Sequence, residues 1–370
     1  MSKKLLLIAI ISALALSPVL LCEKTFAQEK KKNLKLKELM DNLKKKEPQQ
    51  QQTPADLKTA VDKKVKETTE KTQPPKKLTV KQITQSQYLY KFGQPEEKGI
   101  KNFYMEFDPN GNQLLLVTYT EEGDVDKKEK YSYDASNNRT EMIVYNSDGD
   151  VEMKQTYGYD ESGNMTSLAD YDQDGNILQK IVYRYDGRQK VEDVTYSADG
   201  EMMEKITYSY SDKNILESQG FYNGSGELQS KIVYKSDLDG FPYEETNYDP
   251  DGGIIGKVKY SVDANGNILE KTEIGTDNEV LAKTTFQYDN KNNVVEYVEY
   301  NSDQTPVKKI TAKYNASQLK SQEVEYDETG KIVSKYSYEY DNVGSLIKAI
   351  SYNAIDEPET LLKYDYEYYD

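Results

Sequence analysis

The sequence of 370 residues contains no histidine, no tryptophan and only one cysteine, Cys22. Histidine is the side chain whose ordinary pKa lies nearest neutrality, so its absence excludes imidazole acid–base chemistry and histidine metal ligation. A single cysteine cannot form an intrachain disulfide bond. Hydrophobic residues are scarce at 36% and charged residues abundant at 30%, so we expect a fold with much of its surface in water.

Charge is divided unevenly along the chain. Residues 28–79 hold 15 lysines against 8 acidic residues, whereas residues 80–370 hold 30 basic against 55 acidic residues, a net of −25. Binding to nucleic acid or to anionic lipid begins with contacts to phosphate, which such an acidic domain repels. We therefore expect no nucleic-acid partner, and contact with a membrane only through an N-terminal anchor.

The N-terminus is typical of an export signal. Two lysines precede an apolar run at residues 5–21, and residues 25–27, Thr-Phe-Ala, have the small-x-small pattern that signal peptidase cuts. We predict a signal peptide over residues 1–27 and a periplasmic, cell-surface or extracellular protein. Two alternatives remain, since Cys22 follows a stretch similar to a lipoprotein box and the apolar run could persist as a membrane anchor.

Residues 28–79 are interpreted as a tether. Residues 30–46 could form a lysine-rich amphipathic helix of the kind that contacts an anionic membrane or wall polymer. The simpler interpretation is a solvated, partly helical or disordered linker. We predict this linker over residues 28–79 and a separate repeat domain over residues 80–370.

A 26-residue repeat runs through this domain and is marked by two alternating tyrosine series. The first series stands just before one set of turns: Phe107, Tyr133, Tyr159, Tyr185, Tyr210, Ser236, Val262, Tyr288, Tyr314, Tyr340 and Tyr366. The second series lies halfway between: Tyr119, Tyr145, Tyr171, Tyr196, Tyr222, Tyr248, Ile274, Tyr300, Tyr326 and Tyr352. Self-similarity at a fixed period indicates units that bury their apolar faces by stacking on their neighbours.

Each unit is predicted to contain two turns and two strands of about nine residues. At turns such as residues 146–149 and 263–266 an Asp or Asn comes first and a Gly fourth, as in a type I turn followed by a left-handed glycine that makes a bulge, so Asp134 is expected to face Asn138 at the equivalent turn. This register pairs residues of equal parity, so both tyrosine series should share one face. The residues expected together there are Tyr131, Tyr133, Tyr145, Tyr157 and Tyr159 with Ile143, Val151 and Met153.

One lysine per unit falls on the opposite face in this register. The row consists of Lys128, Lys154, Lys180, Lys205, Lys231, Lys257, Lys283, Lys309 and Lys335. Most are expected to lie opposite acidic residues, at roughly 0.2–1 kcal/mol per pair. The expected neighbours are Asp170 for Lys154, Asp193 for Lys205, Glu245 and Glu273 for Lys257, Glu299 for Lys283, Glu325 for Lys309 and Glu323 for Lys335. The alternative is a basic strip that binds a ligand.

One repeat, between Tyr185 and Tyr210, is a residue shorter than the others. Loss of one residue turns every later side chain over unless a turn absorbs it. Asp186-Gly187 is typical of a two-residue type I′ hairpin, so we predict a shorter turn there that keeps later tyrosines on the original face. About 20 to 22 antiparallel strands are expected between residues 85 and 367.

The predicted fold is all-β, an antiparallel meander of about ten 26-residue, two-strand repeats. We expect the sheet to coil around its aromatic face into an open barrel or spiral shell, because a flat sheet would leave that face in water. An elongated single-layer twisted sheet is the alternative. A bacterial outer-membrane barrel is disfavoured, since lysines and acids interrupt the apolar outer band that it needs.

The repeated motif Tyr-Asp-x-x-Gly-Asn, as in residues 159–164, resembles the YD repeats of Rhs-like bacterial surface and toxin proteins. The resemblance covers residues 100–370 and implies a spiral β-shell that encapsulates or displays cargo, secreted or attached to the envelope. The chain differs in its short length, its longer period and the lack of a toxin or autoproteolytic segment after the repeats. It is also similar to MORN-type β-meanders, which imply a free-standing repeat protein.

Other chemistries have less support. The turns at residues 108–112, 172–176 and 249–252 are similar to part of a calcium loop, but their glycine comes too early for an EF-hand, and turn formation explains the same residues. Carboxylates are too numerous for any pair to indicate glycoside hydrolysis. We predict a protein that is not an enzyme, with no catalytic residue, no cofactor and no metal site.

These patterns predict an exported, acidic, tyrosine-rich repeat protein that acts as a binding scaffold at the cell envelope or outside the cell. Its tyrosine rings could stack on sugars or peptide side chains. The expected partner is a protein or an envelope polysaccharide. A purely structural spacer or shell component is the alternative, and a carbohydrate-binding or carbohydrate-active protein is a more distant one.

Overall fold

Strands form all of the regular structure in the computed structural model, which describes residues 79–237 and 240–370. Within these residues no helix is long and apolar enough to cross a membrane. The predicted signal peptide and the predicted linker up to residue 78 lie outside the described residues. The strands are β1 (Val80–Lys91), β2 (Gln94–Pro95), β3 (Ile100–Phe107), β4 (Gln113–Tyr119), β5 (Val125–Tyr133), β6 (Arg139–Tyr145), β7 (Val151–Tyr159), β8 (Met165–Tyr171), β9 (Ile177–Asp186), β10 (Gln189–Ser197), β11 (Met202–Tyr210), β12 (Leu216–Asn223), β13 (Leu228–Ser236), β14 (Pro242–Tyr248), β15 (Ile254–Val262), β16 (Ile268–Ile274), β17 (Val280–Tyr288), β18 (Val294–Tyr300), β19 (Pro306–Tyr314), β20 (Lys320–Asp327), β21 (Ile332–Tyr340), β22 (Leu346–Tyr352) and β23 (Pro358–Tyr368).

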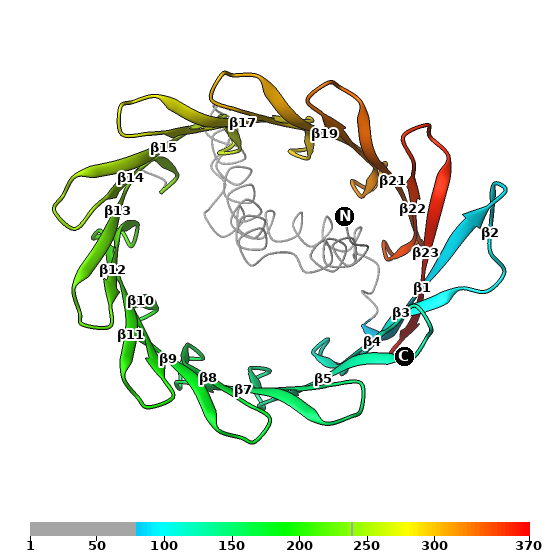
Figure 1. Ribbon diagram of the computed structural model, residues 1–370, viewed down its shortest axis with the longest axis horizontal. Coiled ribbons are helices and arrows are strands. Elements are labelled where there is room, and N and C mark those ends of the chain that lie inside the picture. The colour runs from blue at the N-terminus through cyan, green and yellow to red at the C-terminus, as the bar shows by residue number, and fades with distance from the viewer. Residues whose placement is uncertain (1–78, 238–239) are drawn as a thin grey trace, which may run out of the picture. The chain divides into compact units, whose positions relative to one another are not determined.

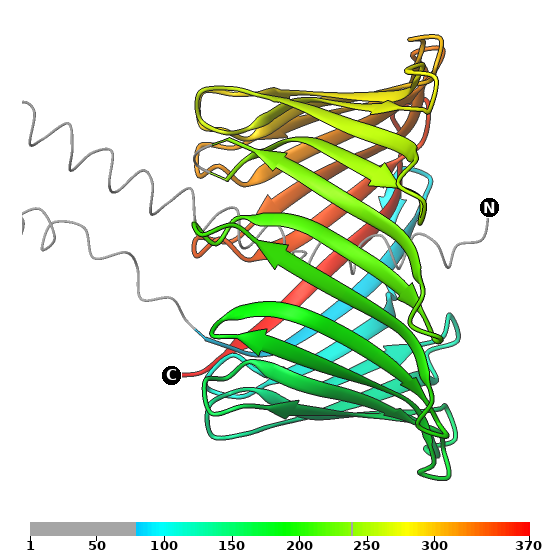
Figure 2. The same cartoon turned by 90° about the vertical axis from the view of Figure 1, so that its left-hand side faces the viewer.

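The sheet closes on itself into a barrel (Figure 1). From β3 to β23 each strand pairs antiparallel with the next one along the chain, and β1 pairs with both β23 and β3. The barrel has 22 strands, and β2 stays outside it as a short hairpin partner of β1. The strands run obliquely to the barrel axis (Figure 2). At a typical tilt of 35–45° the usual strand spacing implies a diameter of roughly 45 Å.

The sequence predicts an all-β barrel correctly, but the barrel is closed, whereas the sequence favours an open one. A closed barrel leaves no long free edge to which another chain could add a strand. The elongated single-layer twisted sheet and the spiral shell are both wrong, because β1 pairs with β23 as well as with β3 and so joins the two ends of the sheet. The closing strand, β1, precedes the first tyrosine of either series, so the repeat pattern contains no sign that the two ends of the sheet pair.

Turns of one type connect most strands at both rims of the barrel. At residues 134–138 the amide of Asp134 donates to the carbonyl of Asn138 at 2.9 Å, and the amide of Asn137 donates to the carbonyl of Asp134 at 3.1 Å. Asn137 has a φ of 65°, the left-handed conformation expected at the fourth position. The predicted turn is therefore correct. We call the rim that holds this turn the YD rim, and the rim that holds turn 146–150 the opposite rim.

A second bulge follows each of these five-residue turns, and the sequence pattern does not indicate it. Tyr133 pairs with Arg139, but the next pair is Ser132 with Glu141, so one residue is passed over. The same shift recurs beside the turns of the opposite rim, where Tyr145 pairs with Val151 before the register moves on. Each extra residue changes the pairing from equal to opposite parity.

The second bulge places the two tyrosine series on opposite faces of the wall, contrary to the prediction. Tyr131 pairs with Met142, whereas Tyr145 pairs with Lys128. Of the residues expected on one face, Tyr145, Ile143 and Val151 therefore lie on the other. The reason is local: the predicted register counted one bulge per turn, and the chain forms two.

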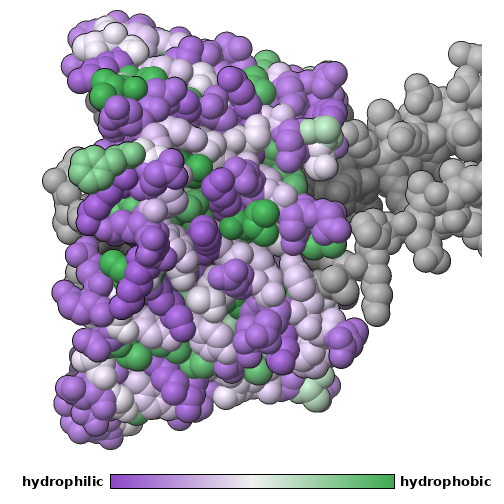
Figure 3. Space-filling view, turned by 90° about the vertical axis from the view of Figure 1, so that its right-hand side faces the viewer, coloured by the Kyte–Doolittle hydropathy of each residue, from purple (hydrophilic) through white to green (hydrophobic). Residues whose placement is uncertain are grey.

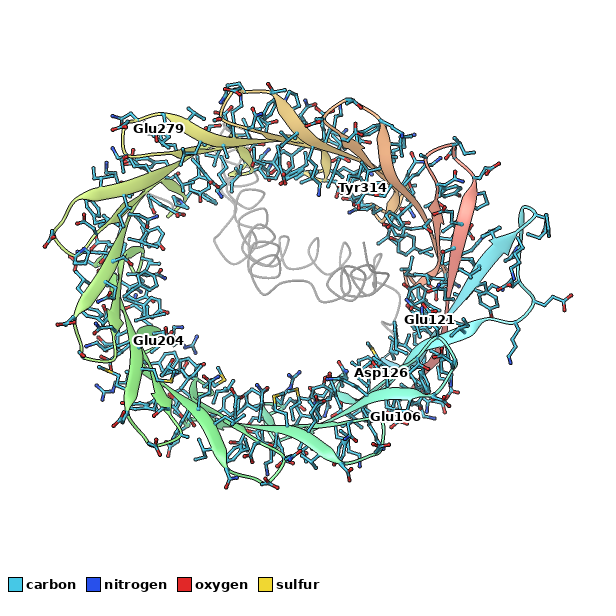
Figure 4. The ribbon with its side chains drawn as sticks, in the orientation of Figure 1. Glu106, Glu121, Asp126, Glu204, Glu279 and Tyr314 are labelled. Atoms are coloured by element: carbon cyan, nitrogen blue, oxygen red, sulfur yellow. The ribbon has the colours of Figure 1, made fainter. Side chains whose placement is uncertain are left out.

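The first tyrosine series faces the lumen, and the second series faces outward. Tyr314, of the first series, lies on the lumen side of the wall, and Glu106 lies on the outer side (Figure 4). Glu106 pairs with Leu115, which shares its face with Tyr119 of the second series because side chains alternate along β4. The remaining cross-strand pairs extend this assignment around the barrel.

Each lumen tyrosine of the first series ties its turn to the preceding repeat. The hydroxyl donates to the backbone carbonyl of the residue twenty positions earlier, at 2.8–3.0 Å. The pairs are Tyr133 with Gln113, Tyr159 with Arg139, Tyr185 with Met165, Tyr210 with Lys190, Tyr288 with Ile268, Tyr314 with Val294, Tyr340 with Lys320 and Tyr366 with Leu346. The tyrosine of the YD motif thus fastens neighbouring hairpins together at the YD rim.

The shortened repeat keeps its faces, as predicted, through a two-residue hairpin. Asp186 pairs with Gln189, and within the turn between them only Gly187 has a positive φ, 62°. This hairpin is centred one residue later than predicted and corresponds to type II′ instead of type I′. A single bulge lies beside it, so Lys180 still pairs with Tyr196 and the outer pattern continues.

The most completely buried side chains lie at the closing seam. Phe103 of β3 and Tyr364 of β23 are 1% and 3% exposed, and their rings meet edge to face at 6.5 Å between centroids. Gln85 of β1, 1% exposed, accepts a hydrogen bond from Asn102 at 3.0 Å. Burial of large side chains at this junction favours closure of the barrel.

Candidate binding surface on the outer wall

The predicted lysine row lies on the outer wall, directly opposite the second tyrosine series. The cross-strand pairs are Lys128 with Tyr145, Lys154 with Tyr171, Lys180 with Tyr196, Lys205 with Tyr222, Lys231 with Tyr248, Lys283 with Tyr300, Lys309 with Tyr326 and Lys335 with Tyr352, while Lys257 faces Ile274. We call these residues the lysine–tyrosine row. Directly paired side chains share a face, so lysines and tyrosines alternate in one band around the barrel.

The predicted acidic neighbours of the row are wrong, because the second bulge moves each of them to the lumen face. Lys154 pairs with Ile143 and Tyr171, and Asp170 pairs instead with Gln155. The other expected partners move in the same way: Asp193 for Lys205, Glu245 and Glu273 for Lys257, Glu299 for Lys283, Glu325 for Lys309 and Glu323 for Lys335. Sequence reasoning therefore missed the lysine–tyrosine contact, which the second bulge creates.

In several units the lysine ammonium lies over the tyrosine ring. The nitrogen of Lys205 is 4.6 Å from the ring centroid of Tyr222, and Lys283 lies 4.7 Å from Tyr300. Lys335 has the same relation to Tyr352, at 4.7 Å. A cation at this distance is attracted by the ring quadrupole, by about 0.5–1 kcal/mol at an exposed site. These three units thus hold a positive charge over an aromatic ring.

The spacing of the row follows from the register. Lys154 pairs with Tyr171, but Lys180 pairs with Ala169, two residues further along the same strand. Successive lysines are therefore two strands and two residues apart, which at ordinary strand dimensions is about 12 Å. Charge and ring recur at this interval around the wall.

Carboxylates neutralise one part of the row. Lys309 forms an ion pair with Glu296 at 2.6 Å, Lys283 lies 3.9 Å from Glu270, and Lys335 pairs with Asp356. We call Lys283, Lys309 and Lys335, with Tyr300, Tyr326 and Tyr352, the paired sector. Lys154 pairs similarly with Glu141, at 2.6 Å.

Another part of the row has no such partners. Among the described residues no carboxylate lies within 4.0 Å of the ammonium groups of Lys180, Lys205 or Lys231. Glu296 lies on the strand before Lys309, two residues from its direct partner Val298. The equivalent diagonal position holds Ser167 for Lys180 and Ser218 for Lys231. We call Lys180, Lys205 and Lys231, with Tyr196, Tyr222 and Tyr248, the bare sector.

Beside Lys205 the diagonal position does hold an acid, Glu192, which pairs with Arg184 at 3.2 Å. The carboxylate is therefore committed to the guanidinium and leaves the ammonium of Lys205 free. Lys180 and Lys231 are exposed, and Lys205 and the three tyrosines are half-buried. The bare sector thus combines two exposed cations and one half-buried cation with three half-buried rings.

The wall around the row is mixed in character. On the side that carries β1, β22 and β23 the surface is mostly hydrophilic, with hydrophobic side chains in small separate groups (Figure 3). Towards the opposite rim, the residue two positions before the row lysine is often an exposed apolar side chain. These residues are Leu178, Met203, Ile255, Leu281, Val307 and Val333.

At β5 and β6 the row borders a shallow hollow of about 390 Å³. Lys128, Lys130, Tyr145 and the turn at residues 146–149 line it, with Val125 at its edge. The ammonium of Lys130 lies 5.5 Å from the ring centroid of Tyr145. This hollow repeats in concave form the combination of cation and ring found along the row.

In the lumen, tyrosine hydroxyls are bonded to acidic side chains. Tyr208 donates to Asp193 at 2.7 Å, and Tyr260 donates to Glu245 at 2.9 Å. Burial, and then the hydrogen bond to the carboxylate, raises the pKa of Tyr208 and of Tyr260 well above the ordinary tyrosine value. These carboxylates hold rings in place on the wall.

The turns with calcium-like sequences use their carboxylates within the turn. Asp172 accepts from the amides of Asp174 and Asn176 through one oxygen and from the Asn176 side chain through the other, at 2.8–3.0 Å. These hydrogen bonds, the Asn176 side chain foremost, lower the pKa of Asp172 below its ordinary value. Within the described residues no group of three or more acidic side chains is arranged to hold a metal ion.

Comparison with known proteins identifies a family and distant structural similarities. A family model described as an uncharacterised protein matches residues 55–241. No curated protein is similar to the chain in sequence. The crystal structure of TcdB2-TccC3 is similar at 13% identity and a TM-score of 0.30, over 73% of this chain and 17% of that one. A porin-like protein from Bacteroides uniformis is similar at 12% identity and a TM-score of 0.28, over 78% of this chain and 98% of that one.

Proposed function

We propose, from the barrel itself, that the protein is an exported, non-enzymatic binding scaffold of the cell envelope or the extracellular space. The chain belongs to the family whose model matches residues 55–241. Its signal peptide, its composition of about ten 26-residue units and its relation to YD-repeat proteins are parts of the same proposal. The partner is an envelope polysaccharide or a protein, held by the outer wall.

The lysine–tyrosine row is the observation that carries this proposal. The hydroxyls of the lumen tyrosines of the first series donate hydrogen bonds to backbone carbonyls, as Tyr185 does to Met165 at 3.0 Å. Among the described residues, no outer tyrosine of the row donates to a backbone carbonyl. The hydroxyls of Tyr171 and Tyr352 contact only the side chains of Thr156 and Ser337, at 3.4 and 3.1 Å, yet tyrosines recur in nearly every repeat beside a lysine. Rings with an apolar face and a polar hydroxyl, beside fixed cations, suit sugars and polar peptides.

A structural spacer or shell component is the second candidate. It is favoured by the seam at Phe103 and Tyr364 and by the tyrosine hydrogen bonds of the YD rim, which all serve the wall itself. On this alternative the outer tyrosines only cover the sheet, and their removal should leave every interaction of the protein unchanged.

Retention of the full-length protein on envelope polysaccharide and protein fractions separates the two candidates. A variant with Tyr145→Ala, Tyr171→Ala and Tyr300→Ala should lose saturable retention while it keeps the far-ultraviolet spectrum of the parent. The matched control replaces the same three residues by phenylalanine, which keeps each ring and should keep most of the retention. No retention in any fraction, or equal retention by the alanine variant, would leave the spacer as the better account.

A further inference from the structure

We propose that the bare sector binds an anionic glycan, a polysaccharide that carries carboxylate groups at intervals along its chain. This inference rests on the proposed binding function and names the class of ligand. The ligand lies across β9 to β14 on the outer wall, with its acid groups on Lys180, Lys205 and Lys231 and its sugar rings against Tyr196, Tyr222 and Tyr248.

Charge complementarity distinguishes this sector from the paired sector. In the paired sector Glu296 holds Lys309 at 2.6 Å, so an incoming anion would have to displace a carboxylate already in place. In the bare sector the lysines have no carboxylate to give up among the described residues. An anion there exchanges only water, and three cations in succession act together.

The tyrosines favour a glycan over a simple polyanion. Each bare lysine pairs directly with a half-buried ring, and the ammonium of Lys205 sits 4.6 Å from the ring centroid of Tyr222. A uronic-acid sugar offers both groups that this pair recognises: a carboxylate for the ammonium and an apolar ring face for the aromatic ring. Polyphosphate offers only the charge.

The interval of the row suits a polymer with widely spaced charges. Successive lysines are about 12 Å apart from strand geometry, so one acid group per disaccharide meets them better than one per sugar. The barrel as a whole is acidic, with 30 basic against 55 acidic residues over 80–370, which disfavours densely charged polyanions through long-range repulsion. Local cations on an acidic protein thus select for sparse charge.

Binding of hyaluronan oligosaccharides, which have one carboxylate per disaccharide, to the full-length protein tests the proposal. Substitution of Lys180, Lys205 and Lys231 by alanine should weaken binding about tenfold, because three charge pairs at the protein surface are lost together. The matched variant, with Lys283, Lys309 and Lys335 replaced by alanine, removes the same charge from the same row. It should change affinity by no more than about twofold, because those cations are already neutralised.

Two further probes decide the chemical class. Chito-oligosaccharides of equal length, which are neutral, should bind at least about tenfold more weakly than hyaluronan. Polyphosphate should be insensitive to alanine at Tyr196, Tyr222 and Tyr248, whereas hyaluronan binding should fall several-fold in that variant. Equal losses in the two lysine variants, or equal binding of the neutral sugar, would overturn the proposal.

The failure of this inference can be told from failure of the proposed function. If hyaluronan does not bind, but an envelope fraction still retains the protein through Tyr145, Tyr171 and Tyr300, the binding scaffold stands and the anionic glycan is wrong. If retention is absent as well, both are wrong. An unchanged unfolding midpoint in each lysine variant shows that lost binding does not reflect lost folding.

Discussion

The two tyrosine series occupy opposite faces of one wall and do different work. On the lumen side, Tyr340 donates its hydroxyl to the carbonyl of Lys320 at 2.8 Å, and Tyr364 is 3% exposed at the closing seam. On the outer side, Tyr300 lies beneath the ammonium of Lys283, and its hydroxyl has no partner within the described residues. The same residue type, repeated at the same period, thus builds the barrel on one face and is free to bind on the other.

This difference teaches that strand parity alone can divide one repeated residue type between a structural role in the wall and, as proposed above, a binding role on its outer face. Each half of the unit ends in a tyrosine, and the bulges beside the turns decide which face that tyrosine meets. Stability should therefore depend on the lumen series and partner binding on the outer series.

The largest expected contrast comes from removal of whole rings. Tyr364→Ala should lower the free energy of unfolding by about 3–5 kcal/mol, because it leaves a cavity against Phe103 at the seam. Tyr222→Ala, on the outer wall, should cost less than about 1 kcal/mol. Chemical denaturation of the two variants measures both values, and equal losses would show that the faces do not divide their tasks in this way.

Removal of the hydroxyl alone gives a smaller and more specific contrast. Tyr340→Phe should lose about 1 kcal/mol, because the Lys320 carbonyl loses its donor at the YD rim. Tyr300→Phe should change stability by less than about 0.5 kcal/mol. Thermal unfolding compares the pair, and a loss in Tyr300→Phe that matches that of Tyr340→Phe would break the comparison.

Alkaline pH should act through other tyrosines of the lumen face, such as Tyr208. The pKa of Tyr208 is raised by burial and by its hydrogen bond to Asp193, so the folded state favours the neutral phenol. The stability that this group contributes is present below the unfolded tyrosine pKa, about 10, and is lost as the pH rises above it. Tyr208→Phe should therefore reduce the fall of the unfolding midpoint between about pH 9 and pH 11, and a fall as steep as that of the parent would contradict this role of Tyr208.

Acid pH should act at the rims and produce the smallest effect. The side chain of Asn138 and two turn amides lower the pKa of Asp134, so its contribution is present above the unfolded aspartate pKa, about 3.9, and is lost as the pH falls through the lower folded value. Asp134→Ala should slightly lower the midpoint at pH 6 and leave it nearly unchanged at pH 2. A variant with the parental dependence on pH would show that the turn carboxylate contributes nothing.

Much of this architecture could be predicted from the sequence. The period, the type I turn at residues 134–138 and the compensating hairpin at Gly187 all have local signals in Asp, Asn and Gly. The second bulge has none, because the residues beside each turn, such as Arg139 and Thr140, carry no common pattern. Because the predicted register omits this bulged residue, it places Tyr145 on the wrong face and gives the row lysines the wrong acidic partners.

Closure and the binding surface were beyond the pattern for a different reason. The pairing of β1 with β23 joins residues far apart in the chain, and neither strand has a sequence motif that indicates its partner. The bare sector depends on what lies diagonally across a strand pair, a serine beside Lys180 and a glutamate beside Lys309. Such differences become visible only once the register is known.

Cross-strand disulfide formation tests the register that underlies the whole account. In a Cys22→Ala background, Lys283→Cys with Tyr300→Cys places two thiols directly opposite on the outer face. Lys283→Cys with Glu299→Cys places them on opposite faces of the wall. We predict that the first pair cross-links on mild oxidation and the second does not. Efficient cross-linking of the second pair alone would contradict the two-bulge register, and with it the lysine–tyrosine row.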